Sequence, residues 1–153
     1  MTAKVGGPRI RFHYLKGRGS LRTTARLKKT LLRLFKQEKR KLESLSIIFC
    51  SDPYLKKINQ AYLKHDYYTD IISFDYSDPG QALVADIFIS IDRVRKNAIR
   101  FRTKPTRELH RVILHGALHF CGYKDKTPRQ TKKIRQKEEE YLVHLRPVPR
   151  GTK

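Results

Sequence analysis

Two histidines and an aspartate in the second half of the chain are the residues whose types and spacing best fit a chemical site. His115 and His119 are four residues apart, so on a helix their rings lie on one face, one turn from each other. Gly122 favours the end of that helix and a reversal of the chain, and Asp125 follows three residues later. Two imidazole nitrogens and a carboxylate oxygen form a three-ligand set with one open position, as in catalytic zinc sites. We therefore predict one zinc ion per chain, bound by His115, His119 and Asp125.

The chemistry of such a centre is the activation of water, because a bound zinc ion can lower the pKa of its water to about 7. The alternative for the two histidines is a role in helix packing or surface hydrogen bonding. A glycine stop followed by a carboxylate favours the metal centre. Metalloproteases with the H-E-x-x-H signature carry a glutamate next to the first histidine, whereas this chain has Gly116 there. Peptide hydrolysis by that mechanism is therefore disfavoured.

The elements that must position this cluster follow from hydrophobic periodicity and turn residues. Alternation of apolar and polar residues, or short apolar runs, predicts four strands, at 10–15, 45–50, 71–76 and 83–90. Asp78-Pro-Gly80 predicts an antiparallel hairpin between the last two strands. Five helices are predicted: from Thr23 or Thr24 to about Phe35, after Ser51 to about Ala61, from Asp92 to Phe101, from Arg107 to Cys121 with Thr106 as cap, and from Pro128 to about His144. This order favours an α+β fold in a single domain over residues 1–153, with a mixed four-stranded sheet and a frayed tail at 146–153.

The charge of the chain points to a polyanionic partner. In 153 residues there are 35 Lys plus Arg against 14 Asp plus Glu, a formal net charge of +21, and nucleic acid is the first candidate for such a field. No apolar run approaches the roughly 18 residues of a membrane span, and the first residues lack the apolar core of a secretory signal. Two isolated cysteines fit neither a disulfide framework nor a cysteine-rich zinc site. We expect a cytoplasmic protein without a membrane partner.

The sequence resembles the YbeY-type bacterial rRNA maturation factors, a family of metal-dependent, single-strand-specific endoribonucleases. The segment from His115 to Tyr123 is similar to the family's H-G-x-L-H-x-x-G-Y metal motif. Upstream, Ile58-Asn59-x-x-Tyr62 and the run from Asp66 to Phe74 resemble L-N-x-x-Y-R and P-T-D-V-L-S-F, and 85–90 resembles G-D-I-x-I-S. The resemblance covers about residues 45–126. It implies maturation of the 3′ end of small-subunit rRNA and ribosome quality control, with single-stranded rRNA and the small ribosomal subunit as partners.

The sequence departs from the family pattern at two positions. The third ligand is usually histidine, and Asp125 adds a negative charge that makes the ion's water less acidic and manganese or another divalent ion more plausible. The family's arginine after the tyrosine, expected to contact the phosphate, is replaced by Leu63. Lys64 or His65 can supply the charge there, although neither reproduces the two-pronged contact of an arginine.

We therefore predict phosphodiester hydrolysis in single-stranded RNA, with Lys64, His65 and Asp70 as the catalytic residues beside the metal. Asp75 and Asp86 are further candidates for proton transfer, and no spacing chooses among these acids. The nucleophile is water or, alternatively, the ribose 2′-OH. Basic runs at 22–41, 93–111 and 132–137 are candidate rims of the RNA-binding cleft, and tyrosines are candidate stacking surfaces, namely Tyr62, Tyr67, Tyr68 and Tyr123. Two competing functions are an RNA- or ribosome-binding protein with a structural metal and a zinc hydrolase of small substrates. The sequence makes no prediction of oligomeric state.

Overall fold

A four-stranded mixed β-sheet forms the centre of the fold in the computed structural model, which describes residues 6–17, 24–65 and 67–147. The strands are β1 (Arg9–Tyr14), β2 (Leu42–Cys50), β3 (Ile71–Asp75) and β4 (Leu83–Ser90), in the spatial order β1-β2-β4-β3. β1, β2 and β4 are parallel, and β3 pairs antiparallel with β4, with Ile71 opposite Ile89. The predicted hairpin is therefore confirmed, and β3 occupies one edge of the sheet.

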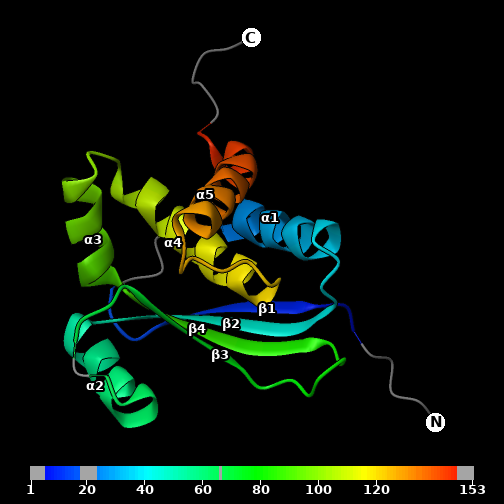
Figure 1. The fold of residues 1–153 in the computed structure, drawn as a ribbon, viewed down its shortest axis with the longest axis horizontal. Helices are drawn as coiled ribbons and strands as arrows, with labels where there is room; N and C mark the ends of the chain where they lie inside the picture. The colour runs from blue at the N-terminus through cyan, green and yellow to red at the C-terminus, as the bar shows by residue number, and fades with distance from the viewer. Residues whose placement is uncertain (1–5, 18–23, 66, 148–153) are drawn as a thin grey trace.

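Helices α1 (Thr24–Gln37), α4 (Pro105–Phe120) and α5 (Pro128–Leu142) cover one face of the sheet, whereas α2 (Asp52–Leu63) lies on the other (Figure 1). Helix α3 (Ile91–Arg100) continues directly from β4 and packs beside the first half of α4. A short 3-10 turn, η1 (Val143–Leu145), follows α5. Within the described residues the predicted α+β class, the four strands and the five helices are confirmed.

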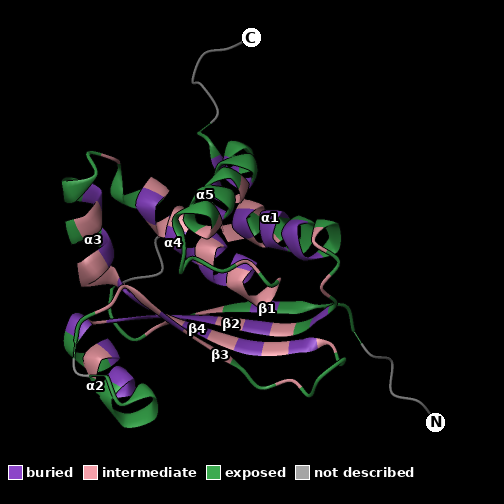
Figure 2. Ribbon diagram, viewed as in Figure 1, coloured by how far each residue is buried: buried purple, intermediate pink, exposed green. Residues whose placement is uncertain are grey.

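Apolar side chains from alternate strand positions form the main core beneath the three-helix layer. Leu45, Ile47 and Phe49 of β2 and Ile87 and Ile89 of β4 point into it, and all five are buried. Burying one such side chain contributes about 1.5–3 kcal/mol. A smaller cluster on the other face holds α2 against the sheet and consists of Cys50, Leu55, Ile58 and Ile72. Figure 2 shows the buried residues facing inward and the outer faces of α1 and α5 exposed.

Several predicted boundaries are moved by capping. The prediction that Thr106 caps α4 is wrong, because α4 begins one residue earlier, at Pro105. Proline suits the first position of a helix because the backbone N–H that it lacks would have no hydrogen-bond partner within the helix. Ser90 caps α3, accepting from the Arg93 N–H, so α3 begins at Ile91 instead of Asp92. At the C-terminal end, most of the tail predicted to fray, 148–153, lies outside the described residues.

Candidate metal centre and RNA-binding groove

The two histidines project from the last turns of α4. His115 and His119 lie on one face of the helix, with ring centroids 4.4 Å apart and nearly perpendicular planes. The helix ends at Phe120, and Gly122 adopts a positive φ of 96°. Residues other than glycine rarely adopt this backbone conformation. The chain turns there as predicted and brings Asp125 back toward the histidines.

Three potential ligand atoms converge at this point. The Nε2 atoms of His115 and His119 are 2.9 Å apart, and Asp125 Oδ2 lies 3.3 Å from the first and 3.5 Å from the second. Ligand atoms of the three residues all lie within 4.8 Å of one another. Atoms at these separations can all reach one ion at the 2.0–2.2 Å typical of zinc–nitrogen and zinc–oxygen bonds.

The hydrogen bonds of the outer ring nitrogens explain why a cation fits here. Nδ1 of His119 lies 2.8 Å from the Tyr123 carbonyl oxygen, which can only accept, so Nδ1 carries the proton. Nδ1 of His115 lies 2.6 Å from Glu138 Oε2 and donates to that carboxylate. In the neutral rings both Nε2 atoms therefore present lone pairs to each other and to the Asp125 carboxylate. Three converging acceptors repel one another unless a cation lies between them, so the donor set fits a divalent metal ion.

Behind the ligands, a buried ionic network orients His115. Glu138 is 1% exposed and also accepts from Arg111 Nη1 at 3.1 Å. Arg111 in turn donates two hydrogen bonds to the buried Glu108 carboxylate, at 2.9 and 2.7 Å. Burial by itself lowers the pKa of Arg111, but the bonds to Glu108 and the charge of Glu138 raise it overall, so the guanidinium stays charged. The network fixes the position of the Glu138 carboxylate, which in turn orients the His115 ring.

Close packing of α4 on the sheet sets the height of the metal centre above β3. A Cβ at Gly116 would lie 2.7 Å from Ile71 Cδ1 and 3.0 Å from Ile87 Cδ1. Glycine therefore lets the helix approach the strands more closely than any other residue would. This contact places the neighbouring His115 beside the edge strand β3.

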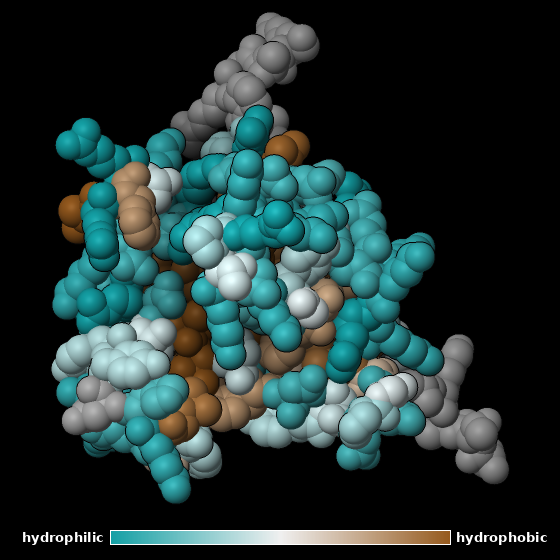
Figure 3. Space-filling model, viewed as in Figure 1, coloured by the Kyte–Doolittle hydropathy of each residue, from teal (hydrophilic) through white to brown (hydrophobic). Residues whose placement is uncertain are grey.

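A groove of about 400 Å³ runs past the metal centre between α2 and α4, with the edge strand β3 along its floor. His65, Asp70 and all three predicted ligands line it, as do Asn59, Leu63, Tyr67, Thr69, Ile71, Ile72 and Ser73. In Figure 3 apolar surface is visible between the hydrophilic side chains over α2 and those over α4. The structure thus brings five of the six predicted site residues into one groove.

Lys64 is the sixth, and it lies outside the lining of the groove. It ends α2 in a left-handed conformation (φ 56°) with its side chain exposed. Asn59, to which the sequence analysis gave no role, holds the segment beyond this cap: its side chain donates to the Tyr67 carbonyl at 3.0 Å and its own carbonyl accepts from His65 N–H at 3.1 Å. His65 then stacks on Tyr67, and Nδ1 contacts the phenol oxygen at 2.9 Å.

Asp70 lies at the start of β3 between α3 and the metal centre. Its Oδ2 accepts from Asn97 Nδ2 at 3.3 Å, and burial raises its pKa although Arg111 and His115 oppose the shift. The other two acids named as proton-transfer candidates do not line the groove: Asp75 pairs with Arg40 at 3.5 Å, and Asp86 accepts from the Tyr76 phenol at 2.9 Å. Asp70 is the acid that the fold places beside the ligands.

The surroundings of the third ligand are strongly basic. Exposed cations lie before and after Asp125, in the turn and in the first turns of α5, namely Lys124, Lys126, Arg129, Lys132 and Lys133. Tyr62, Tyr67 and Tyr68 are exposed on the α2 side of the groove. Tyr123, the fourth predicted stacking residue, is half-buried and donates to Glu38 at 2.7 Å, so its role is structural.

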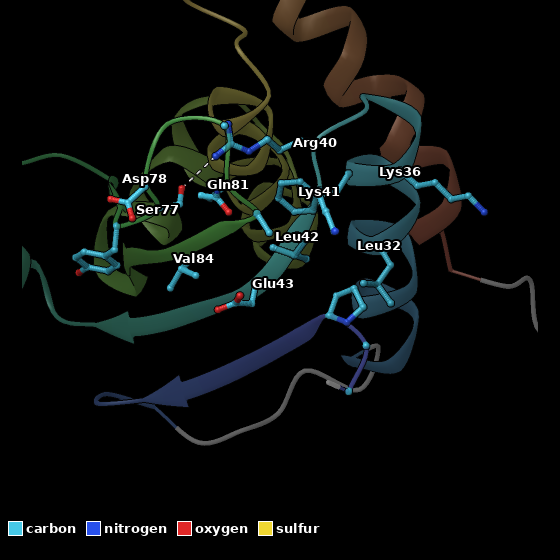
Figure 4. Close-up of a pocket in the computed structure, with 17 residues that line it drawn as sticks. Leu32, Lys36, Arg40, Lys41, Leu42, Glu43, Ser77, Asp78, Gln81 and Val84 are labelled. Atoms are coloured by element: carbon cyan, nitrogen blue, oxygen red, sulfur yellow. Dashed lines mark hydrogen bonds between the residues drawn. The ribbon is translucent and has the colours of Figure 1, made fainter. Parts of the chain in front are cut away.

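A larger cavity of about 1050 Å³ opens at the opposite end of the sheet and contains none of the predicted site residues. Figure 4 shows Arg40 reaching Ser77 across it, with Lys36 and Lys41 on one side and Glu43 and Asp78 on the other. Its cations are largely balanced by carboxylates. This cavity therefore lacks the excess positive charge expected of a phosphate-binding site.

Comparisons with known proteins show the family of the chain. The sequence model described as Endoribonuclease YbeY matches residues 17–146. An Endoribonuclease YbeY from Christiangramia forsetii is 53% identical over 106 residues, which cover 69% of this chain and 73% of the relative. One from Cytophaga hutchinsonii is 48% identical over 122 residues, covering 80% and 85%.

A solved structure has the same fold. The solution structure of TM1509 from Thermotoga maritima matches with a TM-score of 0.62 and 26% identity, and the match covers 94% of this chain and 99% of that one. The agreement therefore extends over almost the whole chain, including α4 and the turn after it, which carry the predicted ligands.

Proposed function

The chain belongs to the YbeY endoribonuclease family, and we propose that it cuts single-stranded RNA in the groove at His115, His119 and Asp125. Its class of activity, endoribonuclease, is that of its relatives. The proposed substrate is the 3′ region of small-subunit rRNA, during maturation and ribosome quality control, with the small ribosomal subunit as partner in the cytoplasm. No helix in the described part of the chain has the length and apolar character needed to cross a membrane.

The observation that carries this proposal is the convergence of three acceptor atoms in the lining of a groove with basic rims. When bound there, a zinc ion would polarise a phosphate oxygen and lower the pKa of a water molecule. The two imidazoles and the carboxylate supply its ligands, and Glu138 and the Tyr123 carbonyl hold the imidazoles in the required tautomer. Because one ligand is a carboxylate, manganese is the principal alternative ion.

We propose that two residues of the groove transfer protons. His65 engages Tyr67 through Nδ1, which leaves Nε2 as its atom for proton exchange. Asp70, whose pKa is raised by burial, is a second acceptor at the end of the groove near α3. We assign them the transfer of protons from the nucleophile and to the leaving oxygen. Water is the proposed nucleophile, and a 2′,3′-cyclic phosphate at the product end would instead identify the ribose 2′-OH.

The rims of the groove supply contacts to the RNA chain. Lys64 beyond α2 and the cations at 124–133 lie on opposite sides and attract phosphates. The exposed rings of Tyr62, Tyr67 and Tyr68 provide surfaces for unpaired bases, which is the reason to expect single-stranded substrates.

The proposal is tested with His119→Ala and, as a matched control, His13→Ala, which changes an exposed histidine on β1. RNA cleavage, RNA binding by fluorescence anisotropy and the thermal unfolding midpoint are measured for both. We expect His119→Ala to remain folded and to bind RNA but to lose cleavage by a factor of 100 or more, whereas the control is unchanged. If His119→Ala unfolds the chain, the metal is structural and the competing RNA-binding function is favoured. If RNA binding is weak and small phosphodiesters are cut by the wild type, a small-substrate hydrolase is favoured.

A further inference from the structure

The end of α3 and the turn into α4 carry a surface that the metal groove does not explain. Five cations lie within ten residues, and the sequence has no acidic residue between Asp92 and Glu108. We call this surface the α3–α4 patch; its cations, all exposed, are Arg95, Lys96, Arg100, Arg102 and Lys104. The run 93–111 was predicted to form a rim of the groove, but these five residues are not part of the groove's lining.

The cations of the patch differ from their neighbours in their lack of carboxylate partners within the part of the chain that the structure describes. Arg93 pairs with Asp52 at 2.7 Å, Arg107 with Glu139 at 2.8 Å and Arg111 with Glu108 at 2.7 Å. By contrast, none of the five patch cations forms an ion pair with any carboxylate in the described ranges. Their charge is therefore available to an external anion.

Two large apolar side chains stand among these cations. Ile99 is 80% exposed and Phe101 is 52% exposed, and the Arg100 guanidinium lies 5.6 Å from the centre of the Phe101 ring. Figure 3 shows apolar surface breaking through hydrophilic side chains over the end of α3, at the upper left. An exposed ring beside unpaired cations is the combination that stacks a base while neutralising the adjacent phosphates.

Backbone hydrogen bonds hold the turn that presents this ring. Phe101 N–H donates to the Asn97 carbonyl at 2.9 Å, and Thr103 N–H donates to Ala98 at 2.9 Å. Arg102, between them, adopts a positive φ of 53°. The backbone position from which Phe101 projects is thus fixed by the fold, so binding there orders little further backbone.

The patch lies at the far end of the helix that carries the metal ligands. From Lys104 at the start of α4 to His119 there are fifteen residues, about 22 Å at 1.5 Å per residue. That is about six nucleotides at the 3.4 Å spacing of a stacked strand. The centre of the Tyr68 ring lies 4.6 Å from Lys56 Nζ and 5.1 Å from the Arg93 guanidinium, so the start of α3 contacts the segment that leads into the groove.

We propose that the α3–α4 patch is a second RNA-binding site, which holds an unpaired stretch of the substrate about six nucleotides from the cut. This inference rests on the proposed function of the groove. Duplex RNA would suit the charge but has no unstacked base to place on the ring. An acidic protein segment would suit both the charge and the ring, and it is favoured if the patch variants bind RNA as tightly as the wild type.

The test compares Arg95→Gln/Arg100→Gln/Arg102→Gln with a control triple of equal charge on exposed arginines outside every basic run named above, Arg9→Gln/Arg11→Gln/Arg146→Gln. Binding of a 20-nucleotide unstructured RNA is measured in chelator at several salt concentrations. For three lost phosphate contacts, the slope of log K against log salt becomes shallower by about 2, with at least a tenfold loss of affinity. The control triple changes the slope by less than 0.5, and Phe101→Ala alone weakens binding about fivefold or more.

Cleavage of two RNAs separates this proposal from the proposed function. The patch triple should lower kcat/KM for the 20-nucleotide RNA and leave kcat/KM for a 6-nucleotide RNA unchanged. Equal losses in the patch and control triples, or no effect of Phe101→Ala, would overturn the patch as a site for unpaired RNA. Patch-dependent binding by a wild-type protein that cuts neither RNA would refute the groove's function while leaving the second site intact.

Discussion

Replacing the buried carboxylate behind the metal centre tests how the site is held. In the wild type, the hydrogen bond between Glu138 and His115 Nδ1 is 2.6 Å long and charge-assisted. Glu138→Gln keeps the shape of the side chain but replaces this bond by a neutral hydrogen bond of about half the strength. Loss of such a partner typically costs a factor of 10 to 100 in metal affinity. That factor corresponds to about 1.4–2.7 kcal/mol of binding free energy.

The same substitution also changes the stability of the metal-free protein. Arg111 loses one of its two carboxylate partners and keeps Glu108, so the free energy of unfolding should fall by about 1–3 kcal/mol. Zinc affinity is measured by competition with a chromophoric chelator, and stability by urea unfolding. Glu139→Gln is the matched control, because Glu139 is adjacent, 58% exposed on its side chain and paired with Arg107 at the surface. Its effect on zinc affinity should be less than twofold.

Two results would refute this reasoning. If Glu138→Gln binds zinc within twofold of the wild type, the carboxylate does not orient His115. If Glu139→Gln weakens zinc as much as Glu138→Gln does, the effect comes from net charge instead of the buried contact.

Three further predictions follow from single residues. Gly116→Ala places a methyl group against Ile71 and Ile87. We expect the free energy of unfolding to fall by about 1 kcal/mol, because the cost of overpacking exceeds the gain in helix propensity, and we expect zinc binding to weaken. Unchanged values in urea unfolding and chelator competition would contradict the close packing. Burial, aided by the charge of Arg26, lowers the pKa of His110 to about 4, from about 6.5 in the unfolded chain. Protons therefore bind preferentially to the unfolded state, and about 3 kcal/mol of stability is lost as the pH falls from 6.5 to 4. Urea unfolding at pH 7 and pH 4.5 should show a smaller loss for His110→Gln than for the wild type, and equal losses would count against this assignment. Asp125→His replaces an anionic ligand by a neutral one, which makes the water bound to the ion more acidic. The rising limb of the pH–rate profile should therefore move to lower pH. A shift to higher pH would be inconsistent with Asp125 as a ligand.

Local patterns in the sequence predict most of the fold and the ligand set. The i, i+4 spacing of His115 and His119 and the glycine stop before Asp125 are local features, and the structure brings the three residues together as expected. The hairpin of β3 and β4 was likewise predictable from the turn residues between them. Periodicity did not predict that α4 starts at Pro105, because a capping threonine and an initiating proline lie side by side in the sequence.

The parts that sequence reasoning missed depend on contacts between distant elements. Glu138 lies 23 residues from His115, within a run of three glutamates that periodicity alone does not distinguish. The short distance between Gly116 and Ile71 joins a helix to an edge strand 45 residues earlier. The basic run at 93–111 was expected to line the cleft as a whole. In the structure Arg111 supports the metal centre from behind, whereas Arg95 to Lys104 lie at the other end of α4.

The most direct measurement of the central claim is a metal titration of cleavage. The purified protein is stripped with chelator, zinc or manganese is added back in fractions of one equivalent, and cutting of an unstructured RNA is followed for the wild type and Asp125→Ala. Cleavage should be absent in the stripped protein and rise to a plateau at one ion per chain, with a much weaker response in the variant. Cutting that persists after complete removal of metal would contradict the account.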